Sequence, residues 1–119
     1  MGLDCSHGAW HGAYSHFMRF RRALARAINL DIDAMEGFGS PYRPWPQNEP
    51  LVVLLNHSDC DGEIEPQHLE ALANRLEEVK AEFIVQATDY CCDNPGEHID
   101  DWVTACRTAA AANESIEFG

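Results

Sequence analysis

Three long stretches of the chain repeat apolar residues every three or four positions, which is the period of one helix face. They predict helices over residues 15–28, 66–79 and 97–113. After a break near Ala81 the same period continues beyond the second helix. Ser15, at the start of the first helix, is a residue type that caps helices with its side chain. These stretches indicate a mainly helical fold.

The remaining segments are shorter. The apolar run 51–55 suits a buried strand or a buried helix, and Pro50 before it favours a helix. Residues 1–14 hold a tandem repeat with two glycines and predict a structured loop. Residues 115–118 alternate polar and apolar side chains, so they predict a short strand that could pair with residues 2–5.

Together these elements predict a single domain over residues 1–119 that is mainly α with a minor β pair. A helix-loop-helix at 49–79 packs on the helices 15–28 and 97–113, and short strands lie near both termini. A chain of 119 residues can bury roughly two-thirds of its unfolded surface, so we expect one core.

Charge is distributed unevenly along the chain. Residues 1–47 hold four acids and five arginines, whereas residues 48–119 hold sixteen acids and three bases, and the net charge is −12. Because acidic surface repels phosphates, duplex nucleic acid is not an expected partner. The acidic part could meet a basic protein, including as a mimic of nucleic acid, or serve solubility alone.

The composition also bears on location. No apolar run approaches the roughly 18 residues that span a membrane, and residues 1–30 lack the charged start and apolar run of a signal peptide. Five cysteines without CxxC spacing favour reduced thiols. We therefore expect a cytoplasmic protein that does not enter a membrane.

Residues 57–68 resemble the twelve-residue calcium loop of the EF-hand family. Aspartates fall at loop positions 3 and 5, glycine at position 6 and isoleucine at position 8, where that family has ligands, a sharp turn and an apolar contact. The backbone carbonyl of position 7 and the side chain of position 9 would complete the set. The candidate ligands are His57, Asp59, Asp61, Glu63, Glu65 and His68.

Two positions of this loop depart from the family. His57 stands at position 1 in place of Asp, and His68 stands at position 12 in place of the bidentate Glu. Calcium needs six to eight oxygens, whereas imidazole suits zinc, nickel, copper or iron. Three hypotheses stay open: a calcium or magnesium site, a transition-metal site, and a metal-free turn whose aspartates bond to the nearby backbone. A divalent cation and no cofactor at all are equally compatible with the sequence.

Three further metal-ligand candidates lie near the N-terminus: Asp4, His7 and His11. If folding brings the glycine-rich loop against the aspartate-rich loop, His7 with His57, Asp59 and Asp61 would form a centre able to activate a water. No Ser-His-Asp order, phosphate-binding glycine loop or dinucleotide fingerprint is present in the sequence.

Arginines gather on one face of the helix predicted over 15–28. Arg19, Arg22 and Arg26 follow one another at helical spacing. Guanidinium groups bind phosphate or carboxylate with paired hydrogen bonds. This face predicts either a pocket for a small anionic ligand or ion pairs with the acidic helices, and the surplus of acids favours the ion pairs.

The stretches HGAWHGAYS and LLNHSDCDGEI, in residues 7–15 and 54–64, resemble uncharacterised small proteins of bacteria and their phages, and residues 111–118 are similar as well. The resemblance implies a self-contained domain of bacterial or phage origin. It would favour an accessory protein that binds a host factor or sequesters a small ligand, and it implies no catalytic residue.

These observations predict a small, cytoplasmic, non-enzymatic binding protein with a candidate cation site in the loop 57–68. Two other functions stay open: an acidic interaction protein that inhibits a host factor, and a metal-dependent hydrolase. The expected partner is a protein or a small anionic ligand, rather than duplex nucleic acid or a membrane.

Overall fold

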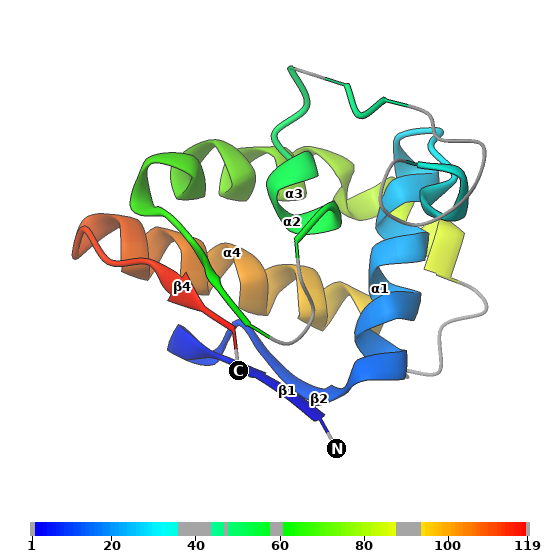
Figure 1. Ribbon diagram of the computed structural model, residues 1–119. Helices are drawn as coiled ribbons and strands as arrows, with labels where there is room; N and C mark the ends of the chain where they lie inside the picture. Colours follow the sequence, from blue (N-terminus) through cyan, green and yellow to red (C-terminus); the bar gives the residue numbers. More distant parts are fainter. Residues whose placement is uncertain (1, 36–43, 47, 58–60, 88–93, 119) are drawn as a thin grey trace.

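Helices make up most of the computed structural model, which describes residues 2–35, 44–46, 48–57, 61–87 and 94–118 (Figure 1). The helices are α1 (Tyr14–Ala27), α2 (Val52–Leu55), α3 (Pro66–Gln86) and α4 (Pro95–Ala111), with short 3-10 turns η1 (Ser6–Gly8) and η2 (Ile32–Ala34). The strands are β1 (Gly2–Cys5), β2 (Trp10–Ala13), β3 (Glu63–Ile64) and β4 (Ile116–Glu117). The mainly α class with minor β pairing is confirmed.

The two longest helices, α3 and α4, lie side by side and share the most extensive contact, while α1 crosses one end of the pair (Figure 1). Aromatic side chains fill the space between the three helices. The ring of Phe20 stacks on Trp102 at a centroid distance of 6.5 Å and meets the edge of Phe83 at 5.3 Å. All three rings are fully buried. Each such pair adds about 1 kcal/mol beyond the burial of its area.

The predicted helices are present, with two corrections. α1 matches the prediction, but Ala13 stands at its N-cap position and Ser15 lies inside the helix. α3 runs without a break past Ala81, because Val79 and Phe83 are buried one turn apart and keep the same face toward the core. Hydrophobic periodicity therefore located these helices, and Pro66 and Pro95 stand at the starts of α3 and α4. The cap at Ser15 and the break near Ala81 were wrong.

The N-terminal segment forms a hairpin: the short strand predicted over residues 2–5 is present as β1, and β2 lies where the sequence predicted a loop. β1 and β2 pair antiparallel, and Leu3 and Cys5 point into the core while their neighbours are exposed. The tight connection between the strands places two residues at positive φ, His7 at 61° and Gly8 at 75°. Glycine adopts this conformation at no steric cost, whereas histidine does so with strain.

The C-terminal strand has a different partner from the predicted one. β4 pairs antiparallel with β3, and a single bridge from Cys5 to Phe118 connects this pair to the N-terminal hairpin. Both ends of the chain therefore lie on the same side of the molecule (Figure 1).

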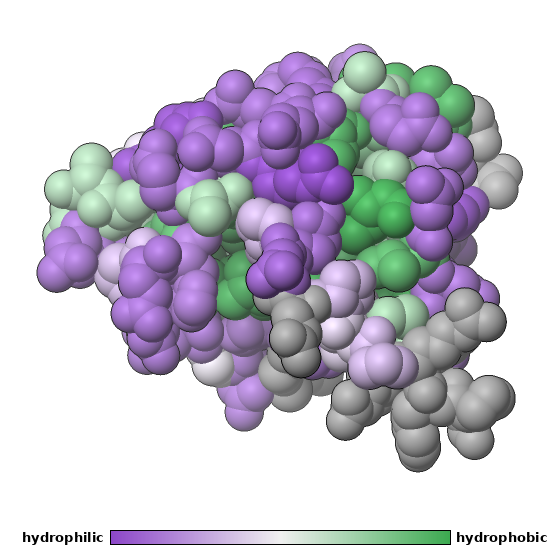
Figure 2. Space-filling view, turned by 90° about the horizontal axis from the view of Figure 1, so that it is seen from above, coloured by the Kyte–Doolittle hydropathy of each residue, from purple (hydrophilic) through white to green (hydrophobic). Residues whose placement is uncertain are grey.

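Figure 2 shows one face of the molecule, on which polar side chains cover most of the described surface and hydrophobic side chains form smaller patches among them. Among the described residues, no helix combines the length and the apolar character needed to cross a membrane.

Candidate functional site

The loop 57–68 turns at the glycine where the sequence predicts a sharp turn. Gly62 adopts φ +90°, as the sharp turn at position 6 requires, and Ile64 is buried in the β3–β4 pair. The helix before the loop, α2, is only four residues long, whereas α3 after it has 21. The helix-loop-helix is therefore strongly asymmetric, and α3 alone packs extensively on α4 and α1.

The side chain of His57 binds the backbone of Glu63, another residue that was predicted to bind a metal. Its Nε2 lies 2.9 Å from the carbonyl oxygen of Glu63, and its ring stacks on Phe118 at a centroid distance of 4.0 Å. Because a carbonyl oxygen can only accept, Nε2 carries the proton and donates. A protonated ring nitrogen has no lone pair for a metal. Two of the atoms expected to bind a cation, Nε2 of His57 and the carbonyl oxygen of Glu63, are thus bound to each other.

A buried arginine approaches the same loop from α1. Arg21 is 2% exposed, and its Nη1 donates to the carbonyl oxygen of His57 at 2.6 Å and to that of Leu55 at 3.3 Å. The guanidinium also lies over the ring of Phe17, 4.7 Å from its centroid. A fixed positive charge beside the first residue of the loop raises the electrostatic cost of placing a second cation there.

The other predicted ligands of this loop are not gathered around a common point. Asp61, Glu65 and His68 are all exposed, and Asp59 lies outside the described residues. Within the part of the chain that the structure describes, no three His, Cys, Asp or Glu side chains are close enough to hold a metal ion.

The N-terminal candidates do not join the aspartate-rich loop either. Asp4 and His11 face each other across the hairpin, with Asp4 Oδ1 and His11 Nδ1 3.5 Å apart, and both side chains are largely solvent-exposed. His7 binds Glu114 instead. The centre of His7, His57 and the aspartates, on which the hydrolase interpretation depended, is therefore not formed among the described residues.

The structure does contain one hydroxyl–imidazole–carboxylate chain that sequence reasoning missed. Ser6 Oγ lies 2.9 Å from His7 Nδ1, and His7 Nε2 lies 2.9 Å from Glu114 Oε1. The backbone N–H of Glu117 donates to Ser6 Oγ at 2.9 Å. Because the carboxylate lies 107 positions from the histidine, no local spacing in the sequence could indicate this contact.

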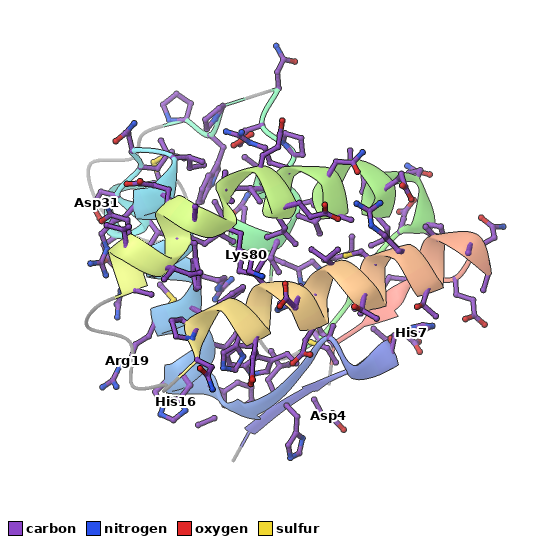
Figure 3. All side chains as sticks on the ribbon, turned by 180° about the vertical axis from the view of Figure 1, so that it is seen from behind. Asp4, His7, His16, Arg19, Asp31 and Lys80 are labelled. Atoms are coloured by element: carbon purple, nitrogen blue, oxygen red, sulfur yellow. The ribbon has the colours of Figure 1, made fainter. Side chains whose placement is uncertain are left out.

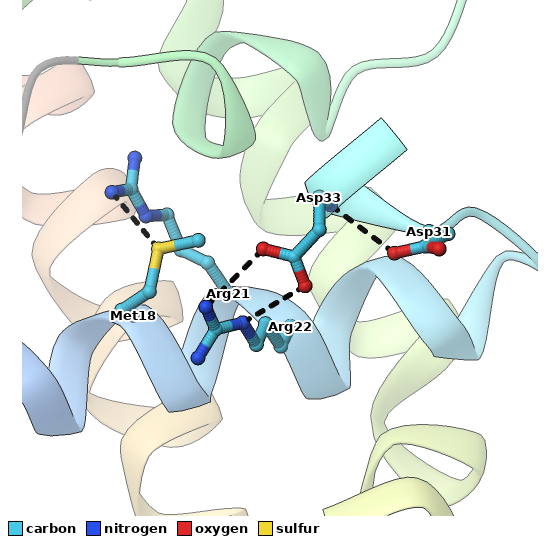
Figure 4. Close-up of polar contacts among 5 residues, drawn as sticks. All are labelled: Met18, Arg21, Arg22, Asp31 and Asp33. Carbon is cyan, nitrogen blue, oxygen red and sulfur yellow. Dashed lines mark hydrogen bonds and ion pairs between the residues drawn. The ribbon is translucent and has the colours of Figure 1, made fainter. Parts of the chain in front are cut away.

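The arginine face of α1 forms a different kind of site. Arg22 makes a two-pronged contact with Asp33, through Nε and Nη2, both at 3.2 Å, and Asp31 Oδ1 accepts the backbone N–H of Asp33 at 3.1 Å (Figure 4). Arg26, one turn further along α1, is exposed and has no ion-pair partner among the described residues. Arg19 lies at the opposite end of the molecule from His7 (Figure 3).

A cavity of about 390 Å³ opens at the C-terminal end of α1, which is called the end of α1 below. Its lining combines two guanidinium groups, two carboxylates and two apolar side chains: Arg22, Arg26, Leu30, Asp31, Ile32 and Asp33. The volume falls at the lower end of the range of small-molecule sites. Of the three predicted arginines, the structure places Arg22 and Arg26 on this cavity and Arg19 outside its lining.

The acidic helices obtain their positive partners elsewhere. Lys80 of α3 pairs with Asp100 of α4 at 2.8 Å, and Arg107 of α4 binds Glu70 and Glu77 of α3. The hydrogen bond to Glu77 raises the pKa of Arg107 above its usual value. Arg22 therefore pairs within its own third of the chain rather than with the acidic helices, contrary to the favoured interpretation of the sequence.

Two further cavities, of about 410 and 380 Å³, flank Glu49. The Glu49 side chain is 12% exposed, and its two oxygens accept from Arg75 Nε at 2.9 and 3.0 Å. This hydrogen bond raises the pKa of Arg75. Since Glu49 and Arg75 neutralise each other, the Glu49 carboxylate between the two cavities already has a partner.

Two cysteines in the described part of the chain, Cys5 and Cys106, are buried. Burial raises the pKa values of Cys5 and Cys106 to about 12, so both are neutral thiols at physiological pH.

Comparison with protein-family models, curated proteins and solved structures found no match to the chain.

Proposed function

We propose that the chain is a small binding protein whose ligand carries a phosphate or carboxylate group and occupies the cavity at the end of α1. The observation that carries this proposal is that Arg22 and Arg26 both line one cavity. Arg26 has no ion-pair partner among the described residues. Two guanidinium groups on one wall suit an oxyanion, because each can offer parallel N–H donors.

The contact between Arg22 and Asp33 does not close the cavity to such a ligand. Both side chains are about half exposed, at 43% and 55%. An exposed ion pair contributes about 0–1 kcal/mol, so an incoming oxyanion can replace Asp33 on Arg22 at little cost. The half-buried side chain of Leu30 then provides an apolar surface for the uncharged part of the ligand.

The test is calorimetric titration with inorganic phosphate and with adenosine monophosphate as a larger probe. Removing the charge in Arg26→Gln should weaken binding about tenfold, because a charge-assisted hydrogen bond contributes about 1.5–3 kcal/mol. Arg19→Gln is the matched control on the same helix, outside the lining of the cavity. Equal affinities of the two variants, or no binding by the wild type, would contradict the proposal.

A second candidate is the binding of a basic protein by the acidic helices. It is supported by the use of Lys80 and Arg107 in ion pairs between α3 and α4, which leaves exposed acids such as Glu82, Glu97 and Asp101 in excess. Affinity for a basic probe such as polylysine should then fall steeply between 50 and 500 mM salt, on the order of the screening expected for surface charges.

A further inference from the structure

We propose that Ser6 is an activated nucleophile, with His7 as its general base and Glu114 as the group that orients His7. The three side chains are linked in that order by contacts of 2.9 Å. A nucleophile in contact with a base, which is in turn held by a third group, is the arrangement by which hydroxyl nucleophiles are recognised regardless of chain order. This site is independent of the cavity at α1, because His7 and Asp31 lie at opposite ends of the molecule (Figure 3).

The positions of the protons follow from the partners. The Glu114 carboxylate accepts from His7 Nε2, so Nε2 carries a proton, and this contact selects the tautomer whose lone pair is on Nδ1. Nδ1 therefore accepts the hydroxyl proton of Ser6, which is the direction that general-base activation requires. Glu114 favours the imidazolium that forms when this proton moves.

A third contact stabilises the oxygen that would attack. The backbone N–H of Glu117 donates to Ser6 Oγ at 2.9 Å. Donation to an oxygen favours its negatively charged form, so this contact lowers the cost of forming a serine alkoxide. One lone pair of Oγ stays available for a bond to substrate.

His7, the proposed general base, also has a strained backbone conformation. His7 holds φ 61° and ψ 15°, a conformation that non-glycine residues rarely adopt. Strain of this kind persists where surrounding contacts hold it, and it concentrates at functional sites. A Cβ atom at Gly8 would meet no atom within 4 Å, so the space beside the residue that follows His7 is open.

The reaction that these groups can perform is ester hydrolysis. Ser6 Oγ adds to the carbonyl carbon while its proton passes to His7 Nδ1, and the bond to the leaving alcohol breaks as His7 returns the proton to that alcohol. Water then adds to the acyl-serine, its proton passes through His7 to Ser6 Oγ, and the carboxylic acid leaves.

The experiment uses a fluorophosphonate, which forms a bond to an activated serine oxygen and releases fluoride. Peptide mass spectrometry of the treated wild-type protein should find the adduct on Ser6. Ser15 is the internal control, because it is exposed and lies at the start of α1. Labelling of Ser6 no faster than Ser15 would overturn the proposal without the need for any variant.

Two variants separate catalysis from a structural role. His7→Gln should slow the labelling of Ser6 about a hundredfold, since general-base catalysis contributes 10² or more. Ser6→Ala should abolish the release of p-nitrophenol from p-nitrophenyl acetate above the background rate. Thermal melting checks that each variant is folded. Unchanged labelling in His7→Gln, or unchanged hydrolysis in Ser6→Ala, would contradict the assignment.

Discussion

The loop 57–68 and the arginine face of Arg19, Arg22 and Arg26 were both candidate binding sites in the sequence, and the two differ in the contacts that their residues make in the structure. In the loop, the ring of His57 and the guanidinium of Arg21 already bind the carbonyl groups of Glu63, His57 and Leu55. At the end of α1, a cavity remains and Arg26 has no ion-pair partner among the described residues. A motif thus names residue types that could bind a ligand, whereas the contacts those residues already make decide whether they remain available.

The largest loss of stability is expected when Arg21, the buried arginine of α1 that binds the start of the loop, is replaced. Arg21→Met should lower the free energy of unfolding by about 3 kcal/mol, because it leaves two carbonyl oxygens without their charged donor. Urea denaturation measures this change. Arg22→Met, the adjacent residue with an exposed partner, is the control and should cost under about 1 kcal/mol. Similar losses in the two variants would mean that Arg21 does not hold the loop.

His57→Ala should have the next largest effect. The variant loses the stacking on Phe118 and the hydrogen bond to Glu63, and each contributes about 1 kcal/mol. Chemical denaturation should therefore show a loss of about 2 kcal/mol. Full stability in this variant would show that the loop does not depend on His57 and would reopen its role as a ligand.

A smaller loss of stability is expected for a substitution at the cavity of α1. Asp33→Asn removes the charge that binds Arg22, so phosphate affinity should rise severalfold while stability falls by under about 1 kcal/mol. Calorimetric titration and a denaturation curve measure the two quantities on one variant. Weaker phosphate binding in Asp33→Asn would contradict the view that Asp33 competes with the ligand.

The smallest effect concerns pH and lies outside both regions. Burial lowers the pKa of His98, partly offset by Asp101 and Glu97, and its ring packs on Trp10 at 4.8 Å. The folded state thus binds the proton less tightly than the unfolded chain, so His98 lowers the free energy of unfolding as pH falls below about 6.5. Replacing His98 by Phe keeps a ring on Trp10 and should flatten the curve between pH 7.5 and 5.5. An equally steep curve in that variant would assign the pH dependence to other groups.

Much of the fold could be predicted because helix faces repeat within a few residues. The spacing of Phe17, Phe20 and Leu24 located α1, and the same spacing places Arg21 beside the apolar face, where it is buried. The turn at Gly62 was equally local.

The rest depended on contacts between distant parts of the chain. The partner of β4, the bond between His7 and Glu114, and the ion pair of Arg22 with Asp33 are set by how the helices pack, which no spacing encodes. The strand over residues 2–5 was predicted, but its hairpin partner β2 was not, because the glycines of the tandem repeat favour a loop. Site chemistry was therefore the less predictable part of the molecule.

One measurement compares the two regions directly: amide spectra of ¹⁵N-labelled protein, freed of metal by a chelator, titrated first with phosphate and then with calcium. We predict that phosphate shifts the signals of residues 22–33 and that calcium leaves those of residues 61–65 in place. Saturable calcium shifts at residues 61–65, with no response to phosphate at residues 22–33, would contradict the assignment of the binding site to the end of α1.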